Sequence, residues 1–323
     1  MRRAHLAAQR GVAIITAMLL TALAVTIVAS LFWQQQVQVR SIENQRLHLQ
    51  TKWILRGALD WARLVLREDA KFSNVDTLDE PWSVQLAETR LDQYVENGRT
   101  GSDQTDATLS GQIVDAQGRF NLANLAQKGK VKPREVAIFA RLLDSLKLDP
   151  GLAQATADSM ARAQPVPPAA SDSNGSAPPA AATEPETQPM ELLQVDDLLA
   201  VPGFTATILA PLREFVTLLP RATPINVNTA SVKVLAASIG TLSQSDAAAL
   251  VAARAKTHFR NSADFIALLP KGKADDISAN DFAVATNFFI VNGKVRLNRA
   301  SMEMQSLIER NNRSTKLIWV RDN

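Results

Sequence analysis

Cysteine is absent from the 323 residues, and histidine is rare. Without thiols the chain forms no disulfide, so an exported part must be held by packing, by metal or by assembly. The three histidines, His5, His48 and His258, lie far apart and lack the spacing of zinc ligands. No Ser, His and Asp arrangement and no Gly-rich phosphate loop stands out. We therefore expect no enzyme activity.

Net charge is also small. The chain has 35 Lys and Arg against 32 Asp and Glu, a formal charge of +3, and Arg2, Arg3 and Arg10 supply much of it. The remainder is close to neutral. This balance argues against nucleic acid as the main partner.

Charged side chains are missing altogether from residues 12–33. A helix of that length, at about 1.5 Å per residue, is long enough to cross a ~30 Å hydrocarbon core. The run is too long for the apolar core of a secretory signal peptide. The basic flank before it predicts a cytoplasmic N-terminus, with the bulk of the chain across the membrane. An uncut signal anchor remains an alternative.

The helical pattern continues without a stop signal to about Glu68. An amphipathic stripe along it predicts that this second half packs on a soluble domain. The stripe consists of Leu47, Ile54, Ala58, Trp61 and Val65. We expect one helix from Val12 to about Glu68, with a lipid-facing first half.

Strand and turn signals follow. After a short helix expected at 84–95, residues 111–125 read as strand, turn and strand, with Asp115 opening the turn and Gly118 supplying a positive φ. Asn121 and Asn124 are expected to bond to local backbone and end the second strand.

The middle of the chain is mainly helical. Helices are expected from Lys132, with Pro133 in the first turn, and on to about Ala163. Residues 164–189 are rich in Pro and Ala and predict a flexible loop. Further helices are expected after it, with a turn at 201–203, Asn228 as an N-cap, Ser243 with Asp246 as a capping box, and a start at Asn261.

The tail is rich in β-forming residues. Asn292-Gly293 predicts one hairpin turn and Asn311-Asn312 a second. These strands should pair with the strand near Ile113. The predicted fold class is α+β, in which a long N-terminal helix packs on a small antiparallel sheet that a large helical insertion interrupts.

Two stretches resemble a known family. Gly11 stands between the basic and apolar segments, where the prepilin peptidase cuts pilin-like proteins, and Thr16 replaces the Glu usual at the fifth mature position. The family of minor pseudopilin K of type II secretion systems typically lacks that Glu. The chain also resembles this family's D-x-x-G-R-F-N signature, with Ala123 in place of a usual Asn. Its matching residues are Asp115, Gly118, Arg119, Phe120, Asn121, Leu122, Asn124 and Leu125, and a second matching stretch, 218–230, contains Asn226, Asn228, Thr229 and Ala230.

The resemblance implies a function and a domain plan. Implied are cleavage between Gly11 and Val12, N-methylation of Val12, and a place at the tip of a periplasmic pseudopilus, which the chain starts or caps. Implied partners are minor pseudopilins I and J, extending to H and the major pseudopilin, besides the prepilin peptidase and the inner membrane. The signature residues are interpreted as structural. The implied segments are a leader at 1–11, a transmembrane helix at 12–33, pseudopilin helix and first sheet part at 34–126, a helical insertion of two sterile-alpha-motif-like parts at 127–281, and final strands at 282–323.

Two other interpretations compete with this one. L-x-V-P-G and I-N-V-N-T-A-S resemble helix-hairpin-helix modules, which suggests a membrane-anchored DNA receptor, but residues 191–219 contain Arg213 as their one basic residue. We therefore favour assembly and expect no nucleic acid. Calcium is the one cofactor that the resemblance raises, but Asp158 and its neighbours lack most of the family's usual acids. Other candidate acids are Asp103, Asp106, Asp275 and Asp276, interpreted as solvated loop residues.

Overall fold

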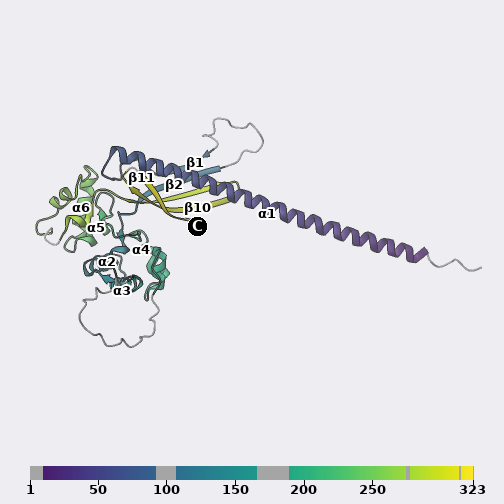
Figure 1. Cartoon of the computed structure of the whole chain (residues 1–323), viewed down its shortest axis with the longest axis horizontal. Helices are drawn as coiled ribbons and strands as arrows, with labels where there is room; N and C mark the ends of the chain where they lie inside the picture. The colour runs from purple at the N-terminus through teal and green to yellow at the C-terminus, as the bar shows by residue number, and fades with distance from the viewer. Residues whose placement is uncertain (1–9, 92–106, 166–188, 274–276, 313, 323) are drawn as a thin grey trace, which may run out of the picture.

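A computed structural model describes residues 10–91, 107–165, 189–273, 277–312 and 314–322. Its longest element is α1 (Arg10–Phe72), a helix of 63 residues that extends from the body as a rod (Figure 1). The rod confirms the predicted long helix, which ends four residues later than expected. Its first half is apolar and exposed throughout, and it is long and apolar enough to cross a membrane.

The second half of α1 packs on a sheet, but through a face displaced by about one residue from the predicted stripe. The buried side chains are Leu55, Leu59, Ala62 and Leu66, each at most 4% exposed. Trp61, expected in the stripe, is 55% exposed. The pattern of three and four holds, because the true face has the same helical period.

The sheet is antiparallel and five-stranded, in the order β1-β2-β9-β10-β11. Its core under α1 includes Trp82 against Phe289, with ring centroids 5.2 Å apart. β2 pairs with β9 although the whole insertion separates them in sequence, as predicted for the strand near Ile113. The bounds are β1 Leu86–Arg90, β2 Ala107–Asp115, β9 Phe288–Leu297, β10 Ala300–Asn311 and β11 Ser314–Asp322.

Some local predictions in the sheet were wrong. The described part of the helix expected at 84–95 is a 3-10 turn, η1 (Pro81–Ser83), followed by β1. Asn292-Gly293 lies inside β9, where Gly293 pairs with Gly111, and the turn falls instead at Asn298, whose φ is 51°. The long partner strands on both sides outweigh the local turn preference. The turn at Asn311-Asn312 is confirmed, with φ 50° at Asn312.

The expected hairpin at 111–125 does not form. After β2, the chain turns away and β3 (Phe120–Asn121) pairs in parallel with β6 (Val216–Thr217). Gly118 is not among the described glycines with positive φ. The chain leaves the sheet at this point because its next hydrogen-bond partner lies in the insertion.

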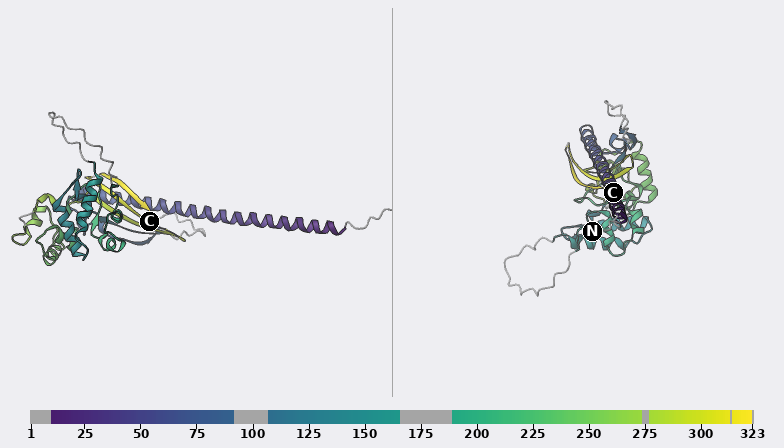
Figure 2. Two further views of the ribbon diagram at one scale, coloured as in Figure 1. Left: turned by 90° about the horizontal axis from the view of Figure 1, so that it is seen from below. Right: turned by 90° about the vertical axis from the view of Figure 1, so that its right-hand side faces the viewer.

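The insertion gathers small helices around one core, beyond the C-terminal end of α1 in both Figure 1 and Figure 2. The helix from Pro133, the helix to Ala163, the Ser243–Asp246 capping box and the Asn261 N-cap are confirmed. Asn228 is not an N-cap, because Ser231 caps the helix after it. The elements are η3 Leu122–Asn124, β4 Ala126–Gln127, β5 Lys130–Val131, α2 Pro133–Ser145, α3 Leu152–Ala163, η4 Val195–Ala200, α4 Ala206–Leu212, β7 Ile225–Asn226, α5 Val232–Ser238, α6 Gln244–Arg254, α7 Ser262–Ala267, η5 Ala279–Asp281 and β8 Phe282–Ala283.

Most of the predicted loop at 164–189, namely 166–188, lies outside the described residues. Its first residue, Gln164, is tied to the body. The side chain donates to Ala126 O and accepts from Gly129 N, both at 3.0 Å. The ordered part therefore extends at least to Gln164.

Candidate functional site at the junction of sheet and insertion

Asp115 ends β2 and is buried at the point where the chain enters the insertion. Its carboxylate accepts four hydrogen bonds, from Gln117 N at 2.6 Å, Asn226 Nδ2 at 2.9 Å, Thr229 Oγ1 at 2.5 Å and Thr286 Oγ1 at 2.7 Å. Burial raises the pKa of Asp115, and these hydrogen bonds oppose the rise. The donors come from both ends of the insertion, so the carboxylate fastens it to the sheet.

Asn226 is the second centre of this junction. Its side-chain nitrogen also donates to Asp76 O and to Thr286 Oγ1, both at 3.1 Å, and its side-chain oxygen accepts from Asn228 N. Asn228 forms a pair of 2.9 Å bonds with the backbone of Phe259. The two asparagines therefore join the end of α1, the sheet and the second half of the insertion.

Gly118 allows two backbones to approach closely. A Cβ there would lie 2.8 Å from Thr229 Oγ1 and 3.2 Å from Thr229 C. Glycine is needed for space and not for the positive φ that the sequence suggested. Ala230 beside it is fully buried, and Arg254 donates to the carbonyls of Val227 and Ala230.

The remaining signature residues hold the first half of the insertion. Phe120 stacks on Phe139, with centroids 5.5 Å apart. Burial lowers the pKa of Arg119, while the charges of Glu214 and Asp115 oppose that shift. Asn121 is buried, and its side-chain oxygen accepts from Ala123 N and also from Leu219 N, so its contacts extend beyond the local backbone that we expected.

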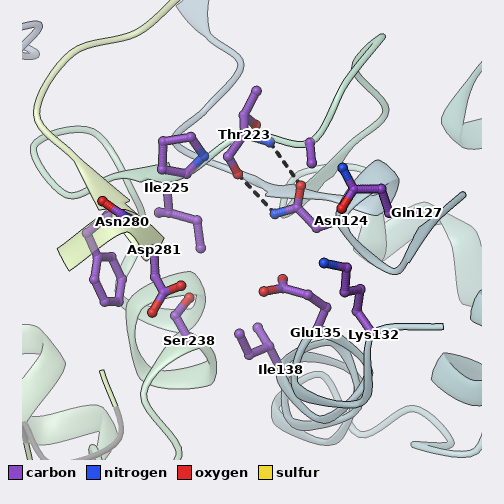
Figure 3. Close-up of a pocket in the computed structure, with 13 residues that line it drawn as sticks. Asn124, Gln127, Lys132, Glu135, Ile138, Thr223, Ile225, Ser238, Asn280 and Asp281 are labelled. Carbon is purple, nitrogen blue, oxygen red and sulfur yellow. Dashed lines mark hydrogen bonds between the residues drawn. The ribbon is translucent and has the colours of Figure 1, made fainter. Parts of the chain in front are cut away.

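Asn124 joins the two halves of the insertion. It exchanges two hydrogen bonds with the backbone of Thr223, at 2.9 and 3.0 Å, beside a cavity of about 270 Å³ (Figure 3). The carboxylate of Glu135 points into this cavity (Figure 3). Burial raises the pKa of Glu135, and the charge of Asp281 adds to the rise, whereas Asn124, Arg134 and Lys132 lower it.

An ion-pair cluster that the sequence did not reveal lies next to the junction. Arg310 is 7% exposed, pairs with Asp69 at 2.8 Å and with Asp76, and lies over the Phe289 ring at 4.6 Å. Burial raises the pKa of Asp76 to about 6, against the opposing effects of Arg310 and Thr286. No local pattern marks these residues, because Arg310 and the two acids are joined only by the fold.

The same cluster contains the acids that come closest to a cation site. Ligand atoms of Asp69, Asp76 and Glu80 lie within 4.8 Å of one another. Arg310 bonds the first two, while Glu80 accepts from Trp82 Nε1 and Thr77 N. The guanidinium therefore already supplies their positive charge. The structure brings Asp158 into no such group, for it is exposed on α3, and Asp103, Asp106, Asp275 and Asp276 lie outside the described residues.

The N-terminal residues predicted to be processed are far from the junction (Figure 1). Gly11 and Val12 lie in the first turn of the described part of α1. Thr16 donates back to Val12 O and Ala13 O, both at 3.0 Å, so the helix itself satisfies its hydroxyl.

The fold and the junction define a pilin-like subunit, in which one long helix has an apolar N-terminal half and packs its C-terminal half on an antiparallel sheet. Family models described as "Type II secretion system (T2SS), protein K" match residues 118–221 and 225–285. The boundary between the two matches falls at Thr223, the residue that Asn124 contacts.

Similar proteins agree. The chain is 31% identical to Type II secretion system protein K of Pseudomonas aeruginosa, over 97% of this chain and 92% of that protein. It also resembles a solved chain of the GspK-GspI-GspJ complex from enterotoxigenic Escherichia coli, with a TM-score of 0.63 and 18% identity over 87% of this chain and 98% of that one. The chain belongs to the type II secretion system protein K family. It is thus a pseudopilin of a secretion apparatus, in a family that is structural and not enzymatic.

Proposed function

We propose that this chain is the minor pseudopilin at the tip of a periplasmic pseudopilus, where it starts and caps the filament. The observation that carries the proposal is the position of the insertion beyond the C-terminal end of α1, opposite the apolar half (Figure 1 and Figure 2). Pilin-like filaments stack subunits by packing long helices about 10 Å apart. A body of this size above the helix would clash with a subunit stacked on it, and an end position avoids the clash.

The proposed partners are minor pseudopilins I and J, with H and the major pseudopilin below them. The solved structure that this chain resembles belongs to a complex of K, I and J. The soluble half of α1 supports a helix-mediated contact, because Trp53, Trp61 and Phe72 expose 70%, 55% and 87% of their surface. Large exposed apolar side chains on one helix are typical of an interface.

We further infer that the prepilin peptidase cuts between Gly11 and Val12, that Val12 is N-methylated, and that the chain sits in the inner membrane with a cytoplasmic N-terminus. The uncharged run at 12–33 behind a basic flank supports this orientation. N-terminal sequencing of the membrane-extracted chain should begin at Val12. A terminus at Met1 would contradict the processing but would leave family membership intact.

Co-expression tests the tip assignment. The full chain should co-purify with I and J in detergent, and a label on it should mark one end of an assembled pseudopilus. A variant lacking residues 166–188 should assemble equally well, because a Pro/Ala-rich segment has little apolar surface to bury. Labels repeated along the shaft, or loss of the complex on that deletion, would contradict the tip position.

The alternative of a DNA receptor is not favoured. Arg213, the one basic residue of 191–219, pairs with Asp196 at 2.7 Å. Phosphate contacts need several cations that are free to release counterions. A gel-shift series should show no tight, steeply salt-dependent binding of DNA.

A further inference from the structure

A second hollow, of about 420 Å³, lies between α2 and the C-terminal end of α5. Its described lining includes three cations, Arg134, Arg141 and Lys273, and no acidic residue. Arg134 and Arg141 are seven positions apart on α2, two helical turns, so both face the hollow. We call these three residues and the space between them the cationic hollow.

The cations differ in how they are satisfied. Arg134 pairs with Asp281 at 2.6 Å. Arg141 donates through Nε to Ala237 O at 2.8 Å, and its guanidinium lies against the backbone of Gly240, where a Cβ would be 3.3 Å from Nη1. Among the described residues no carboxylate pairs with Arg141, and its two terminal nitrogens remain available as donors.

Lys273 completes the hollow from the opposite side. Its ammonium donates to Thr241 O, near the end of α5. The nearby Asp246 is engaged elsewhere, because it closes the capping box with Ser243 at the start of α6. Its pKa is lowered by Ser243 first, and the charge of Lys273 adds to the effect.

The electrostatics of the hollow favour an anion. Arg141 is partly buried, and both burial and the neighbouring charge of Arg134 lower its pKa. Holding two guanidiniums close together in a partly desolvated place costs free energy unless a negative charge compensates. Free terminal nitrogens on a planar guanidinium match the two oxygens of a carboxylate.

We propose that the cationic hollow binds a carboxylate presented by a protein partner, with Arg141 as the main ligand and Arg134 and Lys273 as supporting charges. A phosphate polymer fits less well, because its charges need cations spread along a face and here they converge on one space. The proposal adds a specific contact to the insertion. It does not depend on the tip position.

The test uses the full chain in non-ionic detergent at low salt and a fluorescein-labelled hexaglutamate peptide, followed by anisotropy. The peptide should bind the wild type, and Arg141→Gln should weaken it by about tenfold or more, as expected for loss of a charge-assisted pair. Arg141→Lys should retain part of the binding. Lys273→Gln is a second variant, which should also weaken binding and does not touch α2.

Arg162→Gln is the matched control. Arg162, on α3, also donates through Nε to a backbone carbonyl, that of Asp158, but does not line the hollow. It should bind like the wild type. Circular dichroism of every variant reports whether it is folded.

Several results would overturn the proposal. They are equal weakening in the Arg141 and Arg162 variants, absence of peptide binding to the wild type, displacement by inorganic phosphate as effective as by free hexaglutamate, and tighter binding of a DNA oligonucleotide through the same residues. Binding by an Asp275→Asn, Asp276→Asn variant but not by the wild type would do so too, because the chain's own acids would then occupy the hollow.

Discussion

Asn226 Nδ2 lies 2.9 Å from Asp115 Oδ2, although 111 positions separate the two residues in sequence. This buried bond connects the last residue of β2 to the second half of the insertion. Asp115 also accepts from Thr286, just before the chain returns to the sheet. One carboxylate thus closes the insertion at its base, which explains how a large helical body is held firmly on a small sheet.

Removal of this carboxylate should destabilise the soluble part strongly. Asp115→Ala leaves the donors of Gln117, Asn226, Thr229 and Thr286 without their acceptor in a buried place. Each unsatisfied group costs about 1–3 kcal/mol, so a total loss of about 3 kcal/mol or more is expected in urea unfolding of the full chain in detergent. Asp144→Ala, exposed on α2, should change stability by less than about 0.5 kcal/mol. Similar effects for both variants would contradict the central position of Asp115.

Gly118→Ala should also be destabilising, by about 1–3 kcal/mol, because the new Cβ would press on the backbone of Thr229. Gly57→Ala is the matched control. Gly57 lies in α1, where a new methyl group would meet no other part of the chain within 4 Å, so alanine should stabilise by up to about 1 kcal/mol through helix propensity. The two identical substitutions should therefore differ in sign, and equal shifts in urea midpoint would refute the close-approach argument.

Asp76 should make stability depend on pH. Its pKa is about 6 in the folded chain and 3.8 as the reference value, so the folded state holds the proton more tightly. Its contribution is fully present below about pH 4 and falls as pH rises through about 6, by up to about 3 kcal/mol. The stability of the wild type relative to Asp76→Asn, measured by urea unfolding between pH 4 and 7, should therefore decrease with pH. An increase would mean that pairing with Arg310 outweighs burial.

Thr16→Glu should leave secretion unchanged if the chain occupies only the tip, because no amine of a subunit above is present for Glu to neutralise. Thr21→Glu is the control, since Thr21 makes the same backbone contacts, to Ala17 O and Met18 O, deeper in the apolar run. A charge there costs about 2.5–3.5 kcal/mol of insertion and should reduce secretion. Longer filaments containing more copies of the Thr16→Glu chain would place the subunit in the shaft.

Calcium removal should have little effect. We propose that no calcium site of the family type survives around Asp158, and Arg310 already neutralises Asp69 and Asp76. The thermal unfolding midpoint of the purified chain should shift by less than about 2 °C between chelator and excess calcium. A rise of several degrees on adding calcium would reveal a site. Substitution of Asp158 would then show whether it lies there.

The sequence by itself determined the apolar rod, the helix starts at Pro133, Ser243 and Asn261, and the turn at Asn312, because each depends on side chains within a few residues. It also carried the residues of the junction, although not their contacts. Tertiary structure decided that β3 leaves the expected hairpin for β6, that Gly118 makes room for Thr229, and that Arg310 joins Asp69 and Asp76. These outcomes depend on partners about a hundred or more positions away, whose burial and hydrogen bonds outweigh local turn preferences that are small in free energy.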